Sequence, residues 1–157
     1  MKLEGSCHCG AVRFTVDSAT PYPYMRCYCT ICRKTAGGGG YAINLGADSG
    51  SLKIEGEENL SVYRVASAKH EGGLRQGRRH FCKICGSALW VYDPRWPELV
   101  HPFASAIDTA LPVPPETVHI MLGSKAGWVA AEQGEGHFHC DEYPEKSLSE
   151  WHQRHRL

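Results

Sequence analysis

The amino-acid sequence predicts a single all-β domain, built mainly from short antiparallel strands and ending in one short helix. Two observations lead to this fold class. Short apolar stretches recur at fairly even spacing between turn-forming residues, and 17 glycines and 9 prolines among 157 residues favour turns over long helices. A hydrophobic content of 42% suits one compact domain over residues 1–157 with its own core. The alternative that this pattern leaves open is a small α+β domain.

The clearest predicted strand covers residues 11–17, where Val12, Phe14 and Val16 alternate with polar residues, as in a half-buried strand. Further strands are expected at residues 41–45, 52–54, 60–65, 79–82, 88–92, 118–122 and 128–131. The last two are expected to pair around residues 123–125. One helix is predicted after Ser147, which forms a capping-box pattern with Glu150.

Seven of the eight cysteines fall into three clusters whose spacing is typical of metal ligands. The clusters are Cys7 with Cys9, then Cys27, Cys29 and Cys32, then Cys82 with Cys85. Residues i and i+2 of an extended strand point the same way, so Cys7/Cys9 and Cys27/Cys29 can each present two sulfurs to one ion. Cys82 and Cys85 are expected to lie across a tight turn, with Gly86 supplying unusual backbone angles.

The spacing allows more than one division of these cysteines between ions. Joining Cys7/Cys9 to Cys82/Cys85 makes one closed four-thiolate site and leaves a compact trio with one open coordination position. Joining Cys27/Cys29 to Cys82/Cys85 instead leaves Cys32 without partners, so we favour the first division. A closed site holds a fold together, whereas an open one can bind a substrate. We expect two zinc ions per chain; an iron–sulfur cluster on the trio, or disulfides, are the alternatives.

Three other residues are considered near these clusters. Cys140 is the eighth cysteine, and it could complete the trio's tetrahedron or act as a redox thiol. The interpretation that we favour is an unpaired cysteine at an apolar position. His8 lies between two ligands and is expected to point away from the metal, and His119 is expected to pack within a strand.

The net charge is zero, which gives no support for nucleic-acid or membrane-surface partners. The N-terminal residues lack the apolar stretch of a signal peptide. No run of ~18 apolar residues occurs along the chain, so no membrane span is expected. We therefore expect a cytoplasmic protein.

Four segments resemble, in order, the motifs of the glutathione-dependent formaldehyde-activating enzymes, a domain shared with centromere protein V. They are Gly5–Phe14, Arg26–Lys34, Arg79–Ser87 and the late segment His119–Trp128. The resemblance runs from about residue 5 to 144, so residues of about 145–157 form a C-terminal helical tail. It implies an Mss4-like β-tent fold, a structural zinc on Cys7, Cys9, Cys82 and Cys85, and a catalytic zinc on Cys27, Cys29 and Cys32. The chain departs from the family pattern at Tyr28, at the long glycine run of residues 37–40 and at residues 135–140.

The resemblance also implies a carbon–sulfur lyase type of reaction that joins glutathione to formaldehyde, giving S-(hydroxymethyl)glutathione. Glutathione is anionic, so Arg33, Lys34 and Lys125 are candidate substrate-binding cations, and Trp128 is a candidate for lining the pocket. Residues 37–40, four glycines, could bring backbone amides to a carboxylate or form a flexible loop. The alternatives are a related small aldehyde as substrate, a non-catalytic zinc-stabilised binding module, and a zinc or thiol redox sensor.

Overall fold

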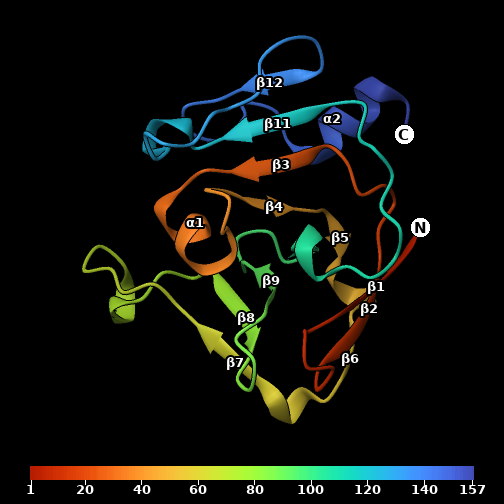
Figure 1. Cartoon of the computed structure of the whole chain (residues 1–157), viewed down its shortest axis with the longest axis vertical. Helices are drawn as coiled ribbons and strands as arrows, with labels where there is room; N and C mark the ends of the chain where they lie inside the picture. The colour runs from red at the N-terminus through yellow and green to blue at the C-terminus, as the bar shows by residue number, and fades with distance from the viewer.

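The computed structural model describes residues 1–70 and 72–157, and its strands form three sheets (Figure 1). The first sheet has the order β1-β2-β6, from β1 (Lys2–Ser6), β2 (Arg13–Asp17) and β6 (Lys53–Glu55). The second has the order β5-β10-β9-β8-β7, from β5 (Ala47–Asp48), β10 (Leu99–Pro102), β9 (Ala88–Tyr92), β8 (Arg78–Cys82) and β7 (Leu60–Tyr63). All neighbouring strands in these two sheets are antiparallel.

The third sheet is mixed and forms the upper end of the molecule in Figure 1. Its order is β12-β11-β3-β4, from β12 (His137–His139), β11 (Thr117–Ile120), β3 (Tyr24–Cys27) and β4 (Ala42–Asn44). Strand β11 runs parallel to both β3 and β12, while β4 is antiparallel to β3. All four residues of β11 are buried, as expected for a central strand.

Two helices complete the described fold: α1 (Thr30–Ala36), which follows β3, and α2 (Leu148–His155), near the C-terminus. The predicted capping box is present, because the Ser147 side chain accepts the Glu150 N–H while Glu150 accepts the Ser147 N–H. The all-β class with a short C-terminal helix is therefore confirmed. No helix in the described residues is long and apolar enough to cross a bilayer.

Two apolar clusters hold the sheets together. The larger cluster joins the first and second sheets, and at its centre Phe14 packs edge-on against Trp90 with ring centroids 5.0 Å apart. Gly5 lies opposite Phe14 across the β1–β2 pair, and a Cβ at residue 5 would overlap the Phe14 ring. The smaller cluster lies between α1 and the third sheet, and it includes Cys27, Cys32 and Phe103.

The structure corrects one predicted strand and adds elements that were not predicted. Residues 128–131 form a loop rather than a strand, and β11 pairs with residues 137–139 instead. Helix α1 was not predicted, since its seven residues lack an apolar stripe and its N-cap is a cysteine. Strands β1, β3, β5, β10 and β12 were also not predicted, since none of them carries an alternating apolar–polar run of the length found at residues 13–17.

Candidate metal centres

Cys7, Cys9, Cys82 and Cys85 form one group, the quartet, in which all four sulfurs lie within 4.8 Å of one another. The Sγ atoms of Cys7 and Cys9 are 3.5 Å apart, and those of Cys9 and Cys82 are 3.8 Å apart. Four sulfurs at ~2.3 Å from a zinc ion lie about 3.8 Å from each other. The donor atoms and their separations therefore fit a tetrahedral zinc ion.

Two turns position the quartet, one from each of the first two sheets. Strand β1 ends at Ser6, so Cys7 and Cys9 lie in a turn and not on an extended strand as predicted. Gly10 closes this turn with φ +76°, and its N–H donates to the Cys7 carbonyl. Cys82 ends β8, and the turn after it carries Cys85 and then Gly86, whose φ is +77°. Glycine favours such positive φ values because it has no Cβ.

Cys27, Cys29 and Cys32 form a second group, the trio, whose three sulfurs also lie within 4.8 Å of one another. Cys27 ends β3, Cys29 is the N-cap of α1, and Cys32 lies in the helix's first turn. The prediction that Cys27 and Cys29 share an extended strand is therefore wrong. The Cys29 sulfur accepts the Cys32 N–H at 3.3 Å, so the sulfur that caps the helix also belongs to the trio.

Within the described residues, no fourth histidine, cysteine or carboxylate joins the trio. Cys140 packs against the apolar cluster that includes Cys27 and Cys32, in agreement with an unpaired cysteine at an apolar position. His8 is exposed, and its backbone N–H donates to the Ser87 hydroxyl. The trio thus supplies three soft ligands, with no fourth histidine, cysteine or carboxylate beside them in the described residues.

The three neighbouring thiols of the trio shift one another's pKa values. Hydrogen bonds from Cys27 and Cys32 lower the pKa of Cys29 to about 2, while hydrogen bonding to Cys29 raises the pKa of Cys27 far above its usual value. The structure therefore favours one thiolate, that of Cys29, beside the neighbouring thiols of Cys27 and Cys32. A divalent cation would allow all three to ionise, and thiolate ligands select zinc among the common divalent ions.

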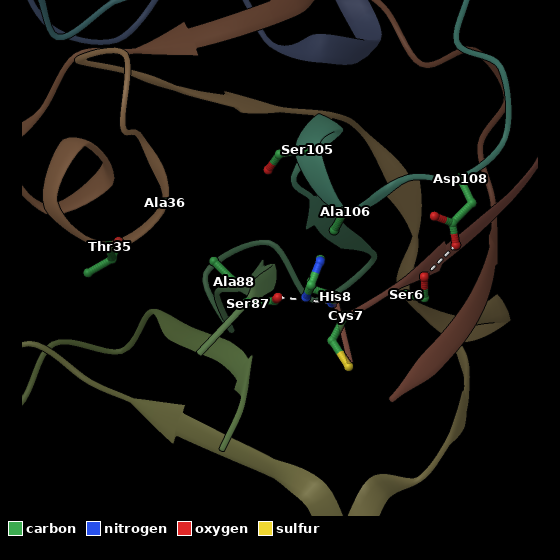
Figure 2. Close-up of a pocket in the computed structure, with 10 residues that line it drawn as sticks. All are labelled: Ser6, Cys7, His8, Thr35, Ala36, Ser87, Ala88, Ser105, Ala106 and Asp108. Atoms are coloured by element: carbon green, nitrogen blue, oxygen red, sulfur yellow. Dashed lines mark hydrogen bonds between the residues drawn. The ribbon is translucent and has the colours of Figure 1, made fainter. Parts of the chain in front are cut away.

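Two adjoining clefts lie between α1 and the second sheet. The larger, of about 500 Å³, lies beside the quartet and is lined by small polar side chains and the Asp108 carboxylate (Figure 2). The Ser6 hydroxyl donates to that carboxylate at 2.7 Å. The smaller cleft, of about 300 Å³, is lined by Arg79 and by aromatic and apolar side chains. Thr35 and Ala88 line both clefts, so the two clefts adjoin each other.

None of the four predicted substrate-binding residues lines either cleft. Arg33 and Lys34 are on α1 but are absent from the linings of both clefts. The Lys125 ammonium donates to the carbonyls of Ala126 and Val129, which ties it to its own loop. Trp128 is in the same loop and is 70% exposed. Substrate binding by these four residues stays a prediction.

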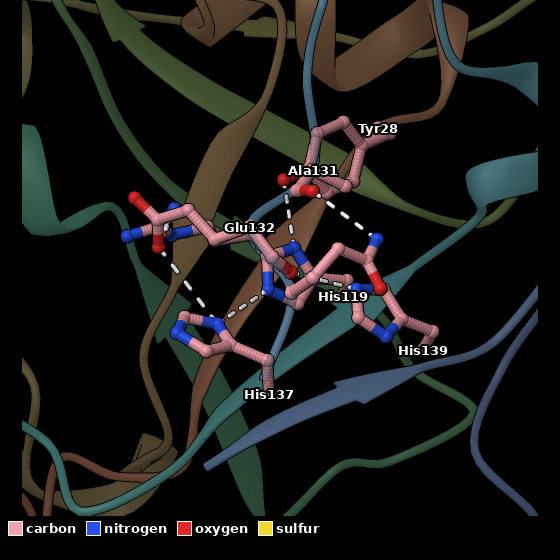
Figure 3. A network of polar contacts seen from close by, with 8 residues as sticks. Tyr28, His119, Ala131, Glu132, His137 and His139 are labelled. Carbon is pink, nitrogen blue, oxygen red and sulfur yellow. Dashed lines mark hydrogen bonds and ion pairs between the residues drawn. The ribbon is translucent and has the colours of Figure 1, made fainter. Parts of the chain in front are cut away.

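Sequence reasoning missed a polar network that starts at Tyr28, between two trio cysteines (Figure 3). The buried Tyr28 hydroxyl bonds to His119 Nδ1 at 2.8 Å, and His119 Nε2 bonds to His137 Nδ1 at 3.0 Å. The His139 ring stacks on His119 with centroids 4.7 Å apart, and its Nε2 bonds to the Glu132 carbonyl. Burial, and then the nearby positive charges, lower the pKa of His119 to about 4, so its ring is neutral at pH 7. The only signals of this network in the sequence were two of the departures from the family pattern, at Tyr28 and at residues 135–140.

A small β domain that carries one four-cysteine and one three-cysteine centre defines a class of thiolate-rich metalloprotein. A family model described as glutathione-dependent formaldehyde-activating enzyme matches residues 2–126. A protein of Halomonas elongata, provisionally named a glutathione-dependent formaldehyde-activating enzyme, is 60% identical over 154 residues, which are 98% of this chain and 96% of that protein. The crystal structure of a Rhodobacter sphaeroides protein is similar with a TM-score of 0.55 and 29% identity, covering 71% of this chain and 92% of that one. The chain belongs to the glutathione-dependent formaldehyde-activating enzyme family, as the motifs predicted.

Proposed function

We propose that this protein joins the thiol of glutathione to formaldehyde at the trio, giving S-(hydroxymethyl)glutathione. The observation that carries the proposal is the trio itself, in which three cysteines converge and no fourth histidine, cysteine or carboxylate joins them in the described residues. Family membership supports glutathione and formaldehyde as the substrates. The quartet, with two buried and two exposed cysteines, is proposed to hold a structural zinc ion.

The proposed reaction is an addition without redox change. A zinc ion held by Cys27, Cys29 and Cys32 would lower the pKa of the substrate thiol. The thiol loses its proton to solvent, its sulfur forms a bond to the formaldehyde carbon, and the carbon–oxygen π pair moves to oxygen, which takes up a proton. The reverse direction is the carbon–sulfur lyase reaction.

The protein's own contribution in this proposal is to position the two reactants. The two adjoining clefts, the larger one polar and the smaller one mainly apolar, offer space for an extended peptide-like molecule. Holding thiol and aldehyde together accelerates an addition that already proceeds slowly in water. All eight cysteines are free thiols, which suits the cytoplasmic location that we also propose.

The test measures the exchange between free glutathione and its formaldehyde adduct by NMR at equilibrium. We expect the zinc-loaded wild type to accelerate exchange above the uncatalysed rate. Cys29→Ser should keep the fold, lower bound zinc from two ions per chain toward one, and reduce the acceleration at least tenfold. Cys140→Ser is the matched control, and it should keep both ions and the rate.

Two results would contradict the proposal in different ways. A wild type that gives no rate above background argues against this substrate pair. A Cys29→Ser variant that unfolds, or that still binds two zinc ions, shows instead that the trio is not an open, non-structural site.

A further inference from the structure

Two adjacent arginines on β8 face opposite sides of the strand, as successive strand residues do. Arg78 is exposed, whereas Arg79 is partly buried and lines the smaller cleft. The Arg79 guanidinium donates from Nη2 to the Cys32 sulfur at 3.5 Å. In the described part of the chain, no other cationic side chain donates a hydrogen bond to a trio sulfur.

A second contact fixes the direction of this guanidinium. Arg79 Nη1 donates to the Thr35 hydroxyl oxygen at 3.4 Å, and the Thr35 hydroxyl in turn donates to the Ile31 carbonyl at 2.7 Å. Since the hydroxyl proton is already used within α1, the Thr35 oxygen is free to accept from Arg79. Cys32 and Thr35 both belong to α1, so the planar fork bridges β8 to two residues of one helix.

Charge balance gives this bridge a consequence for the metal centre. Three thiolates and one divalent cation carry a formal charge of −1, and a permanently charged guanidinium beside one sulfur compensates it. A hydrogen bond to a ligand sulfur also withdraws charge from that sulfur. Groups that contact metal ligands in this way tune the affinity of the site and the acidity of what it binds.

We propose that Arg79 is a positioning residue of the trio, which fixes Cys32 by an N–H···S hydrogen bond and compensates the charge of the three thiolates. Its effect on metal affinity depends only on the trio binding a metal ion. Its effect on the substrate thiol rests on the function proposed above, so the two effects are measured separately.

The experiment compares Arg79→Met and Arg79→Lys with Arg78→Met, a matched loss of charge one residue away on the opposite face of β8. Zinc affinity is measured by titrating the two-zinc protein with a chelating dye. The sulfur-to-cobalt absorption of the cobalt-loaded protein, with the Cys29→Ser spectrum subtracted, reports on the trio. Adduct exchange by NMR is recorded on the same samples.

We expect Arg79→Met to release one of its two zinc ions with about 10–100-fold weaker affinity, and to shift the cobalt absorption of the trio. Arg79→Lys keeps the charge but not the fork, so its affinity should lie between those of Arg79→Met and the wild type. Arg78→Met should match the wild type. An Arg79→Met variant with wild-type zinc affinity and an unshifted cobalt spectrum would overturn the inference. If Arg79→Met does not fold, the same result in Arg79→Lys would overturn it. Loss of affinity in Arg79→Met together with an inactive wild type would uphold it and reject only the proposed reaction.

Discussion

Tyr28 connects the trio to the neighbouring strands through its backbone N–H and its hydroxyl group. Its backbone lies between two trio cysteines, and its N–H donates to the Ile120 carbonyl of β11. Its fully buried side chain bonds to His119, which contacts both histidines of β12. Tyr28 therefore links the segment that carries the trio to two strands of the third sheet.

We expect Tyr28→Phe to lower the free energy of unfolding by about 1–3 kcal/mol, because His119 Nδ1 would remain buried without its partner. Urea denaturation of the zinc-loaded protein measures the change. Tyr41→Phe is the control, since Tyr41 packs on the Tyr28 ring but its hydroxyl makes no hydrogen bond in the described chain. Equal losses in the two variants would show that the network contributes nothing specific.

At the scale of elements, the run of four glycines links α1 to β4, and its members have different roles. A Cβ at Gly37 would overlap the Tyr41 carbonyl, and one at Gly40, where φ is +98°, would overlap the Val129 side chain. Gly38 and Gly39 face open space. Gly40 is thus required for close packing against the loop at residues 125–129, which also carries Lys125 and Trp128.

We expect Gly40→Ala to destabilise the protein by about 2 kcal/mol or more, because positive φ and overpacking against Val129 act together. Gly39→Ala should change stability by less than about 0.5 kcal/mol. Thermal or urea unfolding of both variants makes the comparison. A Gly40→Ala variant as stable as Gly39→Ala would show that the 125–129 loop adapts freely.

At the scale of the whole molecule, the quartet joins segments that are far apart in the sequence. Cys9 follows the first strand of the first sheet, and Cys82 ends a strand of the second, so their sulfurs meet across 73 residues of chain. The Phe14–Trp90 contact joins the same two sheets. The quartet and the larger apolar cluster therefore lie at one common interface between the two sheets.

We predict that Cys82→Ser abolishes cooperative folding, in contrast to Cys29→Ser. Structural zinc contributes ~10 kcal/mol or more in small domains, which is comparable to the whole stability of a domain of this size. Near-ultraviolet circular dichroism, zinc content and urea unfolding distinguish the two variants. A Cys82→Ser protein with a wild-type unfolding midpoint would show that the quartet has no structural role.

Local patterns in the sequence were sufficient for several parts of this fold. The alternation around Phe14, the run at residues 88–92 and the Ser147–Glu150 capping box each depend on neighbours within a few residues, so the chain alone reveals them. The cysteine spacing likewise indicated three local clusters of thiolate ligands, because ligands close in sequence lie close in space, whereas the meeting of Cys9 with Cys82 depends on tertiary contacts. The family motifs then indicated the Mss4-like β-tent fold.

Only the tertiary structure decided the features that depend on distant contacts. Residues 128–131 carry a strand-like pattern, yet the partner of β11 is β12, in parallel register. Arg78 and Arg79 look equivalent in the sequence, but the packing of β8 against α1 brings only Arg79 to Cys32. The histidines at 119, 137 and 139 meet because two strands lie side by side. Residue spacing constrains neighbours along the chain, whereas contacts across tens of residues are set by how the sheets pack.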